Sequence, residues 1–473
     1  MRWLAFVAVV FLVAPLARAD DTSAAIALHA RMSGASGQAK ERAQYELATV
    51  LYRMGLKQAA YGLFAEITER PTHDRYGETL VWLAKLGVDL PEAADVSERV
   101  GKYDDAHIAM LHDDAHRDAF AELEWLSGQY AYRNRNYDDA IARFSRIDRS
   151  SQLYGKAQMM AGMSNVQARR SVPAVQAFQR VVSWLDESAL PPDALRLRDL
   201  ANISMARTYF SAAIHVDERG ASVVDATGIS AAAKYFRRVS PTGELFLDAI
   251  FEDAWTRAWA GDDAHALGDA RLASSRFAEA GLLEALIQYG ACRYDDAASA
   301  IARLRATAEP RKRALTDELA ALEKTPEDDR WRLAMRSPEA TDRKMASYVA
   351  YESLLASEKK RFEALPPAFR SSPLGNDVAD AIALGTDIVH REIGDLGRER
   401  ILRAKDELDD VLRSAAKIEI DVVAAKRDAL ESGAAATPPP PPVRPRTITL
   451  SWPINGNHAP DPLYATPITH ACP

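Results

Sequence analysis

The feature of this sequence that most constrains its fold is a short motif that returns at a fixed interval. The tetrapeptide Tyr-Asp-Asp-Ala starts at Tyr103, starts again 34 residues later at Tyr137, and has a third copy at Tyr294. The same interval separates three further pairs of residues: Gly128 and Gly162, Ala140 and Ala174, and Phe144 and Phe178. A period of this length predicts stacked helix–turn–helix units, each of which buries its apolar face only against its neighbours.

Apolar residues spaced three and four apart mark helix pairs at 41–67, 121–147 and 155–181, and weaker patterns continue to residue 306. We expect an all-α solenoid of about six or seven helix pairs over residues 20–306. In each pair, small residues would lie where two helices cross, and a large aromatic side chain would fill the space beside them. The residues that we expect in these structural positions are Tyr103, Ala106, Gly128, Tyr137, Ala140, Phe144, Gly162, Ala174, Phe178, Tyr294 and Ala297.

The N-terminus has the pattern of a secretory signal peptide. Arg2 precedes an apolar run from Trp3 to Leu16, and Ala17-Arg18-Ala19 places small residues where a signal peptidase reads them. We therefore expect residues 1–19 to be removed, with an uncleaved anchor as the alternative. Cysteine is absent near residue 20, so no lipid attachment is expected, and the mature chain is predicted to be periplasmic.

Composition limits the kinds of partner. Acidic side chains number 67 against 59 basic ones, a balance that does not favour nucleic acid or an anionic membrane surface. Later segments show no uninterrupted apolar run long enough to span a bilayer. The expected partner is therefore an envelope protein or a peptide.

Helical composition persists over residues 307–434, where the repeat signal fades. From Ala404 to Ala429 apolar residues follow one another at alternating steps of four and three, which is a heptad pattern. The residues in this seam are Ala404, Leu408, Val411, Ala415, Ile418, Val422, Ala425 and Ala429. We favour a helix that packs its seam along the solenoid, and the alternative is a coiled coil that forms a homodimer.

A proline-rich linker is predicted at 435–446, and the tail at 447–473 begins with one expected strand, Thr447–Trp452. This strand either joins a sheet edge of another protein or folds back against the solenoid. The chain has two cysteines, Cys292 and Cys472. In an oxidising compartment they could form a disulfide, and the alternative is one buried and one exposed thiol.

The sequence carries little that points to catalysis. His112 and His116 are four residues apart, which on a helix would allow both to bind zinc. However, the residue after His112 is Asp113, whereas a zinc protease motif of this spacing has glutamate there, and a third ligand does not follow at a motif spacing. We predict no catalytic residues, no metal and no cofactor, and keep a metal-dependent hydrolase as a distant alternative.

Binding in a groove is what the repeat architecture predicts. In a right-handed superhelix of helix pairs, the first helices line the concave face, and residues off their packing stripe point into it. The candidate groove residues are Tyr45, Tyr52, Trp125, Gln129, Tyr132, Met159 and Met163. Aromatic and methionine side chains suit a peptide with apolar anchors. The alternative is that several of them belong to the core between repeats.

Residues 41–67, 121–181 and 280–306 resemble tetratricopeptide repeats, with Gly128, Ala140 and Phe144 at signature positions. Some members hold a partner's C-terminal carboxylate through Lys and Asn, but here Leu126 and Gln129 stand at those asparagine positions. Short motifs resemble secreted repeat proteins of myxobacteria and relatives, some of which are linked to gliding motility. These motifs are Ala254-Trp255, Gly261-Asp262, Glu284-Ala285, Cys292-Arg293-Tyr294 and Trp452-Pro453. Residues 455–459 depart from that pattern.

Taken together, these features predict a secreted, non-catalytic adaptor of the cell envelope. It would capture a peptide or protein partner in the concave groove, while the C-terminal helix and tail hold it in a larger assembly. The alternative is a structural spacer that assembles through the C-terminal coiled coil.

Overall fold

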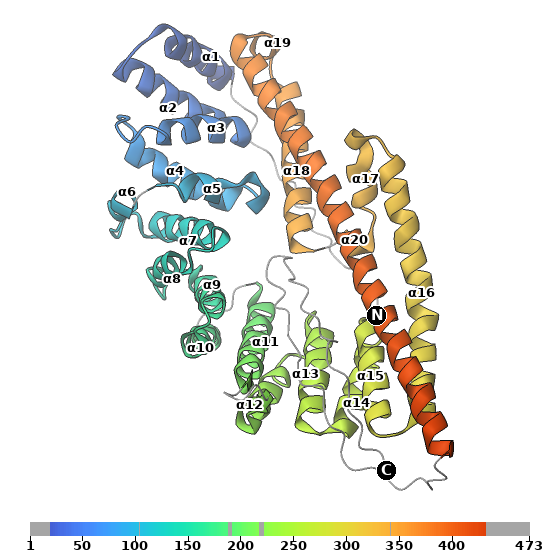
Figure 1. Cartoon of the computed structure of the whole chain (residues 1–473). Helices are drawn as coiled ribbons and strands as arrows, with labels where there is room; N and C mark the ends of the chain where they lie inside the picture. The colour runs from blue at the N-terminus through green and yellow to red at the C-terminus, as the bar shows by residue number, and fades with distance from the viewer. Residues whose placement is uncertain (1–18, 104, 188–191, 217–221, 341, 432–473) are drawn as a thin grey trace, which may run out of the picture. The chain divides into compact units, whose positions relative to one another are not determined.

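A computed structural model describes residues 19–103, 105–187, 192–216, 222–340 and 342–431 (Figure 1). The predicted signal peptide up to Arg18 and the predicted linker and tail, including Cys472, lie outside the described residues. The described residues are helical apart from turns and one two-stranded hairpin, which confirms the predicted all-α fold. Among the described helices, none combines the length and the apolar character that crossing a membrane needs.

The chain forms two compact units, and each is built from two separate stretches of sequence. Unit 1 comprises Met1–Leu123 and Ala346–Glu392, and unit 2 comprises Glu124–Met345 and Ile393–Pro473. Three of the described helices, α7 (Arg117–Arg133), α18 (Arg343–Glu363) and α20 (Pro373–Glu431), contribute residues to both units.

Unit 1 contains six helices from the start of the chain and two from later in it. They are α1 (Ala19–Gly34), α2 (Gln38–Arg53), α3 (Lys57–Thr68), α4 (Tyr76–Asp89), α5 (Val96–Val100), α6 (Asp105–Ala109), most of α18 (Arg343–Glu363) and α19 (Pro367–Arg370), with a 3-10 turn at Glu92–Ala94.

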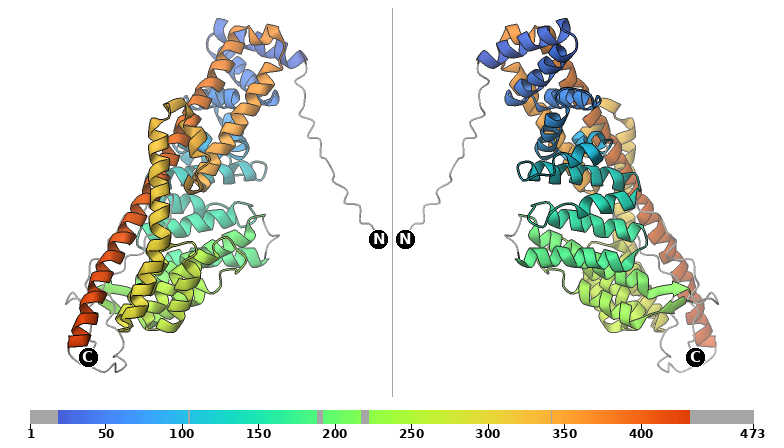
Figure 2. Two further views of the ribbon diagram at one scale, coloured as in Figure 1. Left: turned by 90° about the vertical axis from the view of Figure 1, so that its right-hand side faces the viewer. Right: turned by 90° about the vertical axis from the view of Figure 1, so that its left-hand side faces the viewer.

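Unit 2 contains a series of helix pairs that stack side by side (Figure 2). Its helices are α8 (Tyr137–Ser145), α9 (Tyr154–Gln167), α10 (Ser171–Glu187), α11 (Ala194–Ala213), α12 (Ala226–Phe236), α13 (Phe246–Ala260), α14 (Asp263–Ala273), α15 (Ala278–Gly290), α16 (Tyr294–Lys324) and α17 (Arg330–Ala334), with 3-10 turns at Glu327–Asp329 and Pro338–Ala340. A short antiparallel hairpin of β1 (Ile214–Val216) and β2 (Ser222–Val224) joins α11 to α12.

Five helix pairs close with the same turn. The residue two places before the second helix has a positive φ, between 56° and 87°, and these residues are Gly55, Arg135, Arg169, Gly261 and Cys292. The next residue then donates its N–H to the carbonyl five positions back, as in the 2.9 Å bond from Asn136 to Ala131. This Schellman arrangement satisfies the last carbonyls of the first helix and reverses the chain.

The crossing of two helices inside a pair explains the 34-residue period. A Cβ atom on Gly128 would lie 2.5 Å from Cε1 of Phe144, and one on Gly162 would lie 2.4 Å from Cε1 of Phe178. Both phenylalanine side chains are fully buried. Each glycine is therefore required by the ring that lies against it, which is the arrangement that the sequence predicts.

The first copy of the tetrapeptide folds differently from the other two. Tyr137 and Tyr294 each begin the second helix of a pair, of nine and 31 residues. Tyr103 instead lies in a turn, and Ala106 is exposed on the five-residue α6. The expectation that Ala106 fills a buried crossing position is wrong. A helix this short has no long partner face to bury, and Tyr103 instead donates a hydrogen bond to Thr68 of α3.

Unit 1 is closed by α18, which comes from much later in the sequence. The backbone N–H of Gln58, in the first turn of α3, donates to Oε1 of Glu358 at 3.0 Å. The hydroxyl of Tyr351 donates to Oε1 of Gln58 at 2.7 Å, and the backbone N–H of Ala93 donates to Oγ of Ser347 at 2.9 Å. Glu358 thus caps the N-terminus of α3 from another helix, because the first N–H groups of a helix have no partner within it.

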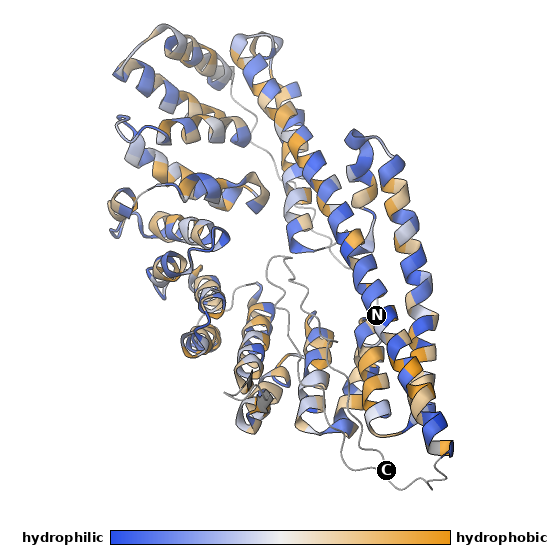
Figure 3. Cartoon of the chain, viewed as in Figure 1, coloured by the Kyte–Doolittle hydropathy of each residue, from blue (hydrophilic) through white to orange (hydrophobic). Residues whose placement is uncertain are grey.

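The heptad seam of α20 packs inside unit 2. Five of its residues, Leu408, Val411, Ala415, Ile418 and Val422, are buried in one cluster with residues of α15 and α16. In Figure 3 the apolar sides of α15, α16 and the C-terminal half of α20 come together. This packing is the interpretation favoured from the sequence, and it occupies the face that a coiled-coil dimer would need. The domain boundary expected at 306 falls inside α16, which continues without a break to Lys324.

Candidate binding surface

Three partly exposed aromatic side chains lie together in unit 1. Tyr45 and Tyr52 project from α2, and Trp82 projects from α4. The rings of Tyr52 and Trp82 meet edge to face with centroids 4.9 Å apart, and Trp82 stacks on the buried ring of Phe64 at 5.3 Å. We call Tyr45, Tyr52 and Trp82 the aromatic surface.

Hydrogen bonds hold these rings in place. The indole N–H of Trp82 donates to the hydroxyl of Tyr45 at 3.0 Å, and the hydroxyl of Tyr52 donates to the carboxylate of Asp89. Burial raises the pKa of both tyrosine hydroxyls, and for Tyr52 the neighbouring Asp89 raises the pKa further. Both tyrosines are therefore neutral at physiological pH, and each ring is fixed at its polar end while part of its face remains open.

Cations border the aromatic surface. The ammonium of Lys85 lies 4.7 Å from the ring centroid of Tyr52 and 5.1 Å from that of Trp82. On the other side, the guanidinium of Arg75 lies 5.9 Å from the ring centroid of Tyr45. Arg75 is paired with Glu78 at 2.6 Å, whereas within the part of the chain that the structure describes Lys85 has no carboxylate partner. The surface thus combines apolar rings with an exposed positive charge.

The seven predicted groove residues are divided between the two units. Tyr45 and Tyr52 are in unit 1, and the other five are in unit 2. Of those five, Tyr132 and Met159 are buried, each at 7% exposure. Tyr132 lies against Tyr137 with ring centroids 5.8 Å apart, and Met159 belongs to the core shared by α9, α10 and α11. Their expected role in a groove is corrected to one in the core.

The remaining three candidate groove residues are partly buried, and each has different neighbours. Trp125 tilts onto the buried ring of Phe144, with centroids 5.5 Å apart, and Met163 packs against the same core as Met159. Gln129 is partly exposed on α7. The interpretation that several of these side chains belong to the core between repeats therefore holds for unit 2.

Sequence reasoning missed Trp82 and Lys85. Residues 70–106 match the 34-residue register only at their end, so the register does not align the first helix of that region with the first helices of the other pairs. The usable signal was an interval of 37 residues, which separates Tyr45 from Trp82 and Tyr52 from Asp89, the two pairs joined by hydrogen bonds.

The histidine pair considered for zinc lies in a turn. His112 packs against the ring of Phe120, and Nδ1 of His116 lies 2.9 Å from Oδ1 of Asp113. Because this segment is not helical, the two histidines do not share a helix face as the spacing suggested. Within the described ranges of the chain, no group of three or more His, Cys, Asp or Glu side chains is placed to hold a metal ion.

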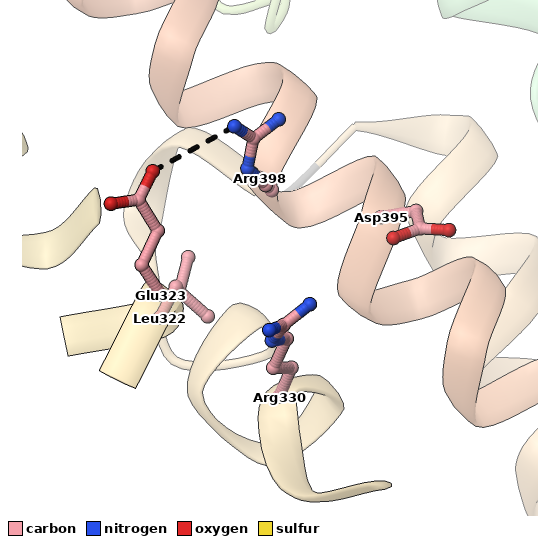
Figure 4. A pocket seen from close by; sticks show the side chains of 5 residues that line it. All are labelled: Leu322, Glu323, Arg330, Asp395 and Arg398. Carbon is pink, nitrogen blue, oxygen red and sulfur yellow. Dashed lines mark ion pairs between the residues drawn. The ribbon is translucent and has the colours of Figure 1, made fainter. Parts of the chain in front are cut away.

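One pocket of about 390 Å³ lies in unit 2 between the end of α16, the start of α17 and α20 (Figure 4). It is lined by Leu322, Glu323, Arg330, Asp395 and Arg398. Arg398 and Glu323 face each other at 3.7 Å, and Nε of Arg330 donates to the carbonyl of Thr325 at 3.1 Å. Charges of both signs alternate around this opening, so it offers no single chemistry to a ligand and is a weaker candidate than the aromatic surface.

Comparison with known proteins gives similar solved structures but no relative by sequence. No family model and no curated protein matches this chain. A crystal structure of Rap protein complexed with competence and sporulation factor has 13% identity and a TM-score of 0.27, covering 79% of this chain and 100% of that one.

Two further structures are similar at the same level. The APC/C hetero-tetramer Cut9–Hcn1 has 14% identity and a TM-score of 0.22, covering 84% of this chain and 93% of that one. A circular tandem repeat protein with novel repeat topology has 12% identity and a TM-score of 0.16, covering 87% of this chain and 96% of that one. In its own helix pairs, its repeated turns and its glycine–phenylalanine crossings, the chain is similar to tetratricopeptide-type helical repeat proteins.

Proposed function

We propose that this protein is a non-catalytic interaction scaffold of the cell envelope that binds a protein or peptide partner through the aromatic surface of unit 1. The observation that carries the proposal is the row of Tyr45, Tyr52 and Trp82 with Lys85 beside it. Partly exposed aromatic side chains that are fixed by neighbours lose little entropy on binding and are frequent hot spots of interfaces.

The charges indicate the chemistry of the partner. Tyr52 and Trp82 offer ring faces to an apolar or aromatic anchor. Lys85, which lies above both rings, offers an ammonium to a carboxylate beside that anchor. The partner that fits is a segment with an apolar side chain next to an acidic one. The envelope location rests on the predicted signal peptide and is tested by the mass of the N-terminal peptide recovered from a periplasmic fraction.

A photoreactive amino acid at position 85 tests the binding site in cells that make the protein. Position 359 is the matched control, because Lys359 is also an exposed lysine of unit 1 but lies on α18. We expect one or a few envelope proteins to be crosslinked from position 85 and not from position 359. Crosslinks only between copies of this chain would instead favour a self-assembling spacer.

Two substitutions then test the surface on the purified complex. Trp82→Ala removes the central ring, and we expect it to weaken binding by about 30-fold, the loss of a hot-spot side chain worth about 2 kcal/mol. Lys85→Glu leaves the rings in place and reverses the exposed charge, so it should weaken binding without changing the fold. Lys359→Glu is its control. Equal affinity of all three variants and the parent protein would contradict the proposal.

A further inference from the structure

Besides its buried seam, α20 carries a second apolar stripe in unit 2. Ile420, Val423 and Leu430 are 70%, 63% and 76% exposed, whereas most exposed positions around them are charged or small. Steps of three and seven residues place the three side chains on one flank of the helix. We call Ile420, Val423 and Leu430 the outer stripe.

Ion pairs show which flank this is. With about 100° of rotation per residue, Glu419 and Lys426 lie between the buried seam and the outer stripe. Glu419 pairs with Arg305 at 2.7 Å, and Lys426 pairs with Asp295, and both partners are on α16. The outer stripe is therefore on the side of α20 that faces α16.

The path of the chain after α20 begins and ends near this stripe. The pair of Lys426 and Asp295 puts the last turns of α20 beside the start of α16. Cys292 lies in the turn just before α16 and is disulfide-bonded. The only other cysteine of the chain is Cys472, which is outside the described residues. A chain that leaves α20 at Glu431 and bonds to Cys292 through Cys472 therefore starts and ends near the C-terminal end of α20, where the outer stripe lies.

One segment of that returning chain matches the outer stripe in pattern and length. In Thr447–Trp452 polar and apolar residues alternate, so Ile448, Leu450 and Trp452 share one side of an extended strand. From Ile448 to Trp452 such a strand spans about 13 Å at 3.3 Å per residue. The outer stripe spans about 15 Å along the helix at 1.5 Å per residue.

We propose that Thr447–Trp452 docks on the outer stripe of its own chain, with Ile448, Leu450 and Trp452 covering Ile420, Val423 and Leu430. The connection from Glu431 to Thr447 reaches up to about 50 Å when extended, so it does not restrict docking. Because both ends of the segment are tethered, its effective concentration at the stripe is in the millimolar range, which favours it over a second copy or a free partner. This inference is independent of the aromatic surface in unit 1.

Photocrosslinking within the purified, unreduced protein tests the contact. A photoreactive residue at Val423 should crosslink to the 447–452 peptide within a monomer. The control is the same residue at Leu384, which is 63% exposed on the part of α20 that belongs to unit 1. The proposal would be overturned if the crosslinks joined two chains. It would also be overturned if position 423 crosslinked to the 447–452 peptide no more efficiently than position 384.

Trypsin cleavage after Arg446 gives a second measurement, because that bond directly precedes the docked segment. Cleavage follows the population of the undocked state, so the double variant Ile420→Asp, Val423→Asp should be cut about tenfold faster than the parent protein. Leu384→Asp should leave the rate unchanged. The C-terminal fragment should separate only after reduction, since Cys472 holds it to Cys292. An unchanged rate in the double variant, or release of the fragment without reduction, would refute the docking.

Discussion

Replacing Gly162 with alanine places a methyl group where the ring of Phe178 already lies. The new Cβ would be 2.4 Å from Cε1, 2.7 Å from Cδ1 and 2.8 Å from Cζ of that ring. Phe178 is fully buried between α9 and α10, so the ring has no open space into which it can move. Either the two helices separate or the ring leaves its rotamer.

The magnitude follows from two opposing effects. Forcing an extra methyl group into a well-packed core costs about 1–3 kcal/mol. Alanine is also a better helix former than glycine by about 1 kcal/mol, which offsets part of that cost. We expect Gly162→Ala to destabilise the α9–α10 pair by up to about 2 kcal/mol. Gly268 lies inside α14, and a Cβ atom added there would have no other heavy atom within 4 Å. Gly268→Ala should therefore stabilise α14 by up to about 1 kcal/mol.

Hydrogen exchange followed by mass spectrometry is the suitable assay, because a chain with two units has no single well-defined unfolding midpoint. Amides of α9 and α10 should exchange up to about 30-fold faster in Gly162→Ala, and amides of α14 should exchange more slowly in Gly268→Ala. Adding Phe178→Leu to Gly162→Ala should recover stability relative to the sum of the single changes, by about 0.5–2 kcal/mol.

The reasoning is refuted by two results. If Gly162→Ala and Gly268→Ala change local stability equally, the close approach of Phe178 has no energetic consequence. If the effects of Gly162→Ala and Phe178→Leu are simply additive, the two residues are not coupled through this contact.

Three further substitutions test contacts that stabilise each of the two units. Burial raises the pKa of Glu358 to about 7, above the ordinary value of 4.5, although its bonds to the start of α3 oppose the shift. Between those values the folded state binds more protons than the unfolded state, so the stability of α3 should fall as pH rises from about 5 to 8. Glu358→Gln should remove this dependence from the exchange of α3 amides. Arg169 has φ 59°, a left-handed backbone conformation that costs a residue with a side chain about 1 kcal/mol. Arg169→Gly should remove this cost and slow the hydrogen exchange of amides in α9 and α10. Leu408→Ala empties a buried position of the seam and should cost about 2–4 kcal/mol, measured by exchange in the C-terminal half of α20. Leu402→Ala on the same helix is the control, and because Leu402 is 36% exposed it should cost well under half as much stability. Equal losses of stability in the two variants would contradict the packing of the seam.

Much of the repeat could be predicted because its contacts are local. Gly162 meets Phe178 only 16 residues later, and both ends of that contact recur 34 residues away from their counterparts in the preceding pair. The heptad seam of α20 was visible for the same reason, since a helix that buries one face repeats its apolar residues every three or four positions. Periodicity did not identify the turns at Arg135 and Arg169, where the backbone takes a left-handed conformation without glycine.

The candidate site was predicted only in part. Tyr45 and Tyr52 were found from the helix pattern, but Trp82 joins them through an interval that departs from the main period. Tyr132 and Met159 have the same residue chemistry as a binding surface, yet both are buried. Whether an aromatic side chain of a first helix faces solvent or a neighbouring helix depends on the packing of the next pair, and this information is not in the helix that carries the residue.

The sequence by itself therefore determined the fold class, the helix pairs and the seam of α20, because each rests on contacts between residues that are close in the chain or repeat at a regular step. Only the tertiary structure decided that the chain divides into two units and that α18 closes the first of them. Glu358 caps α3 across 300 residues of sequence, and a contact at that separation leaves no periodic signal. It forms because the unpaired N–H groups at the start of α3 need an acceptor, and the folded chain brings that carboxylate to them.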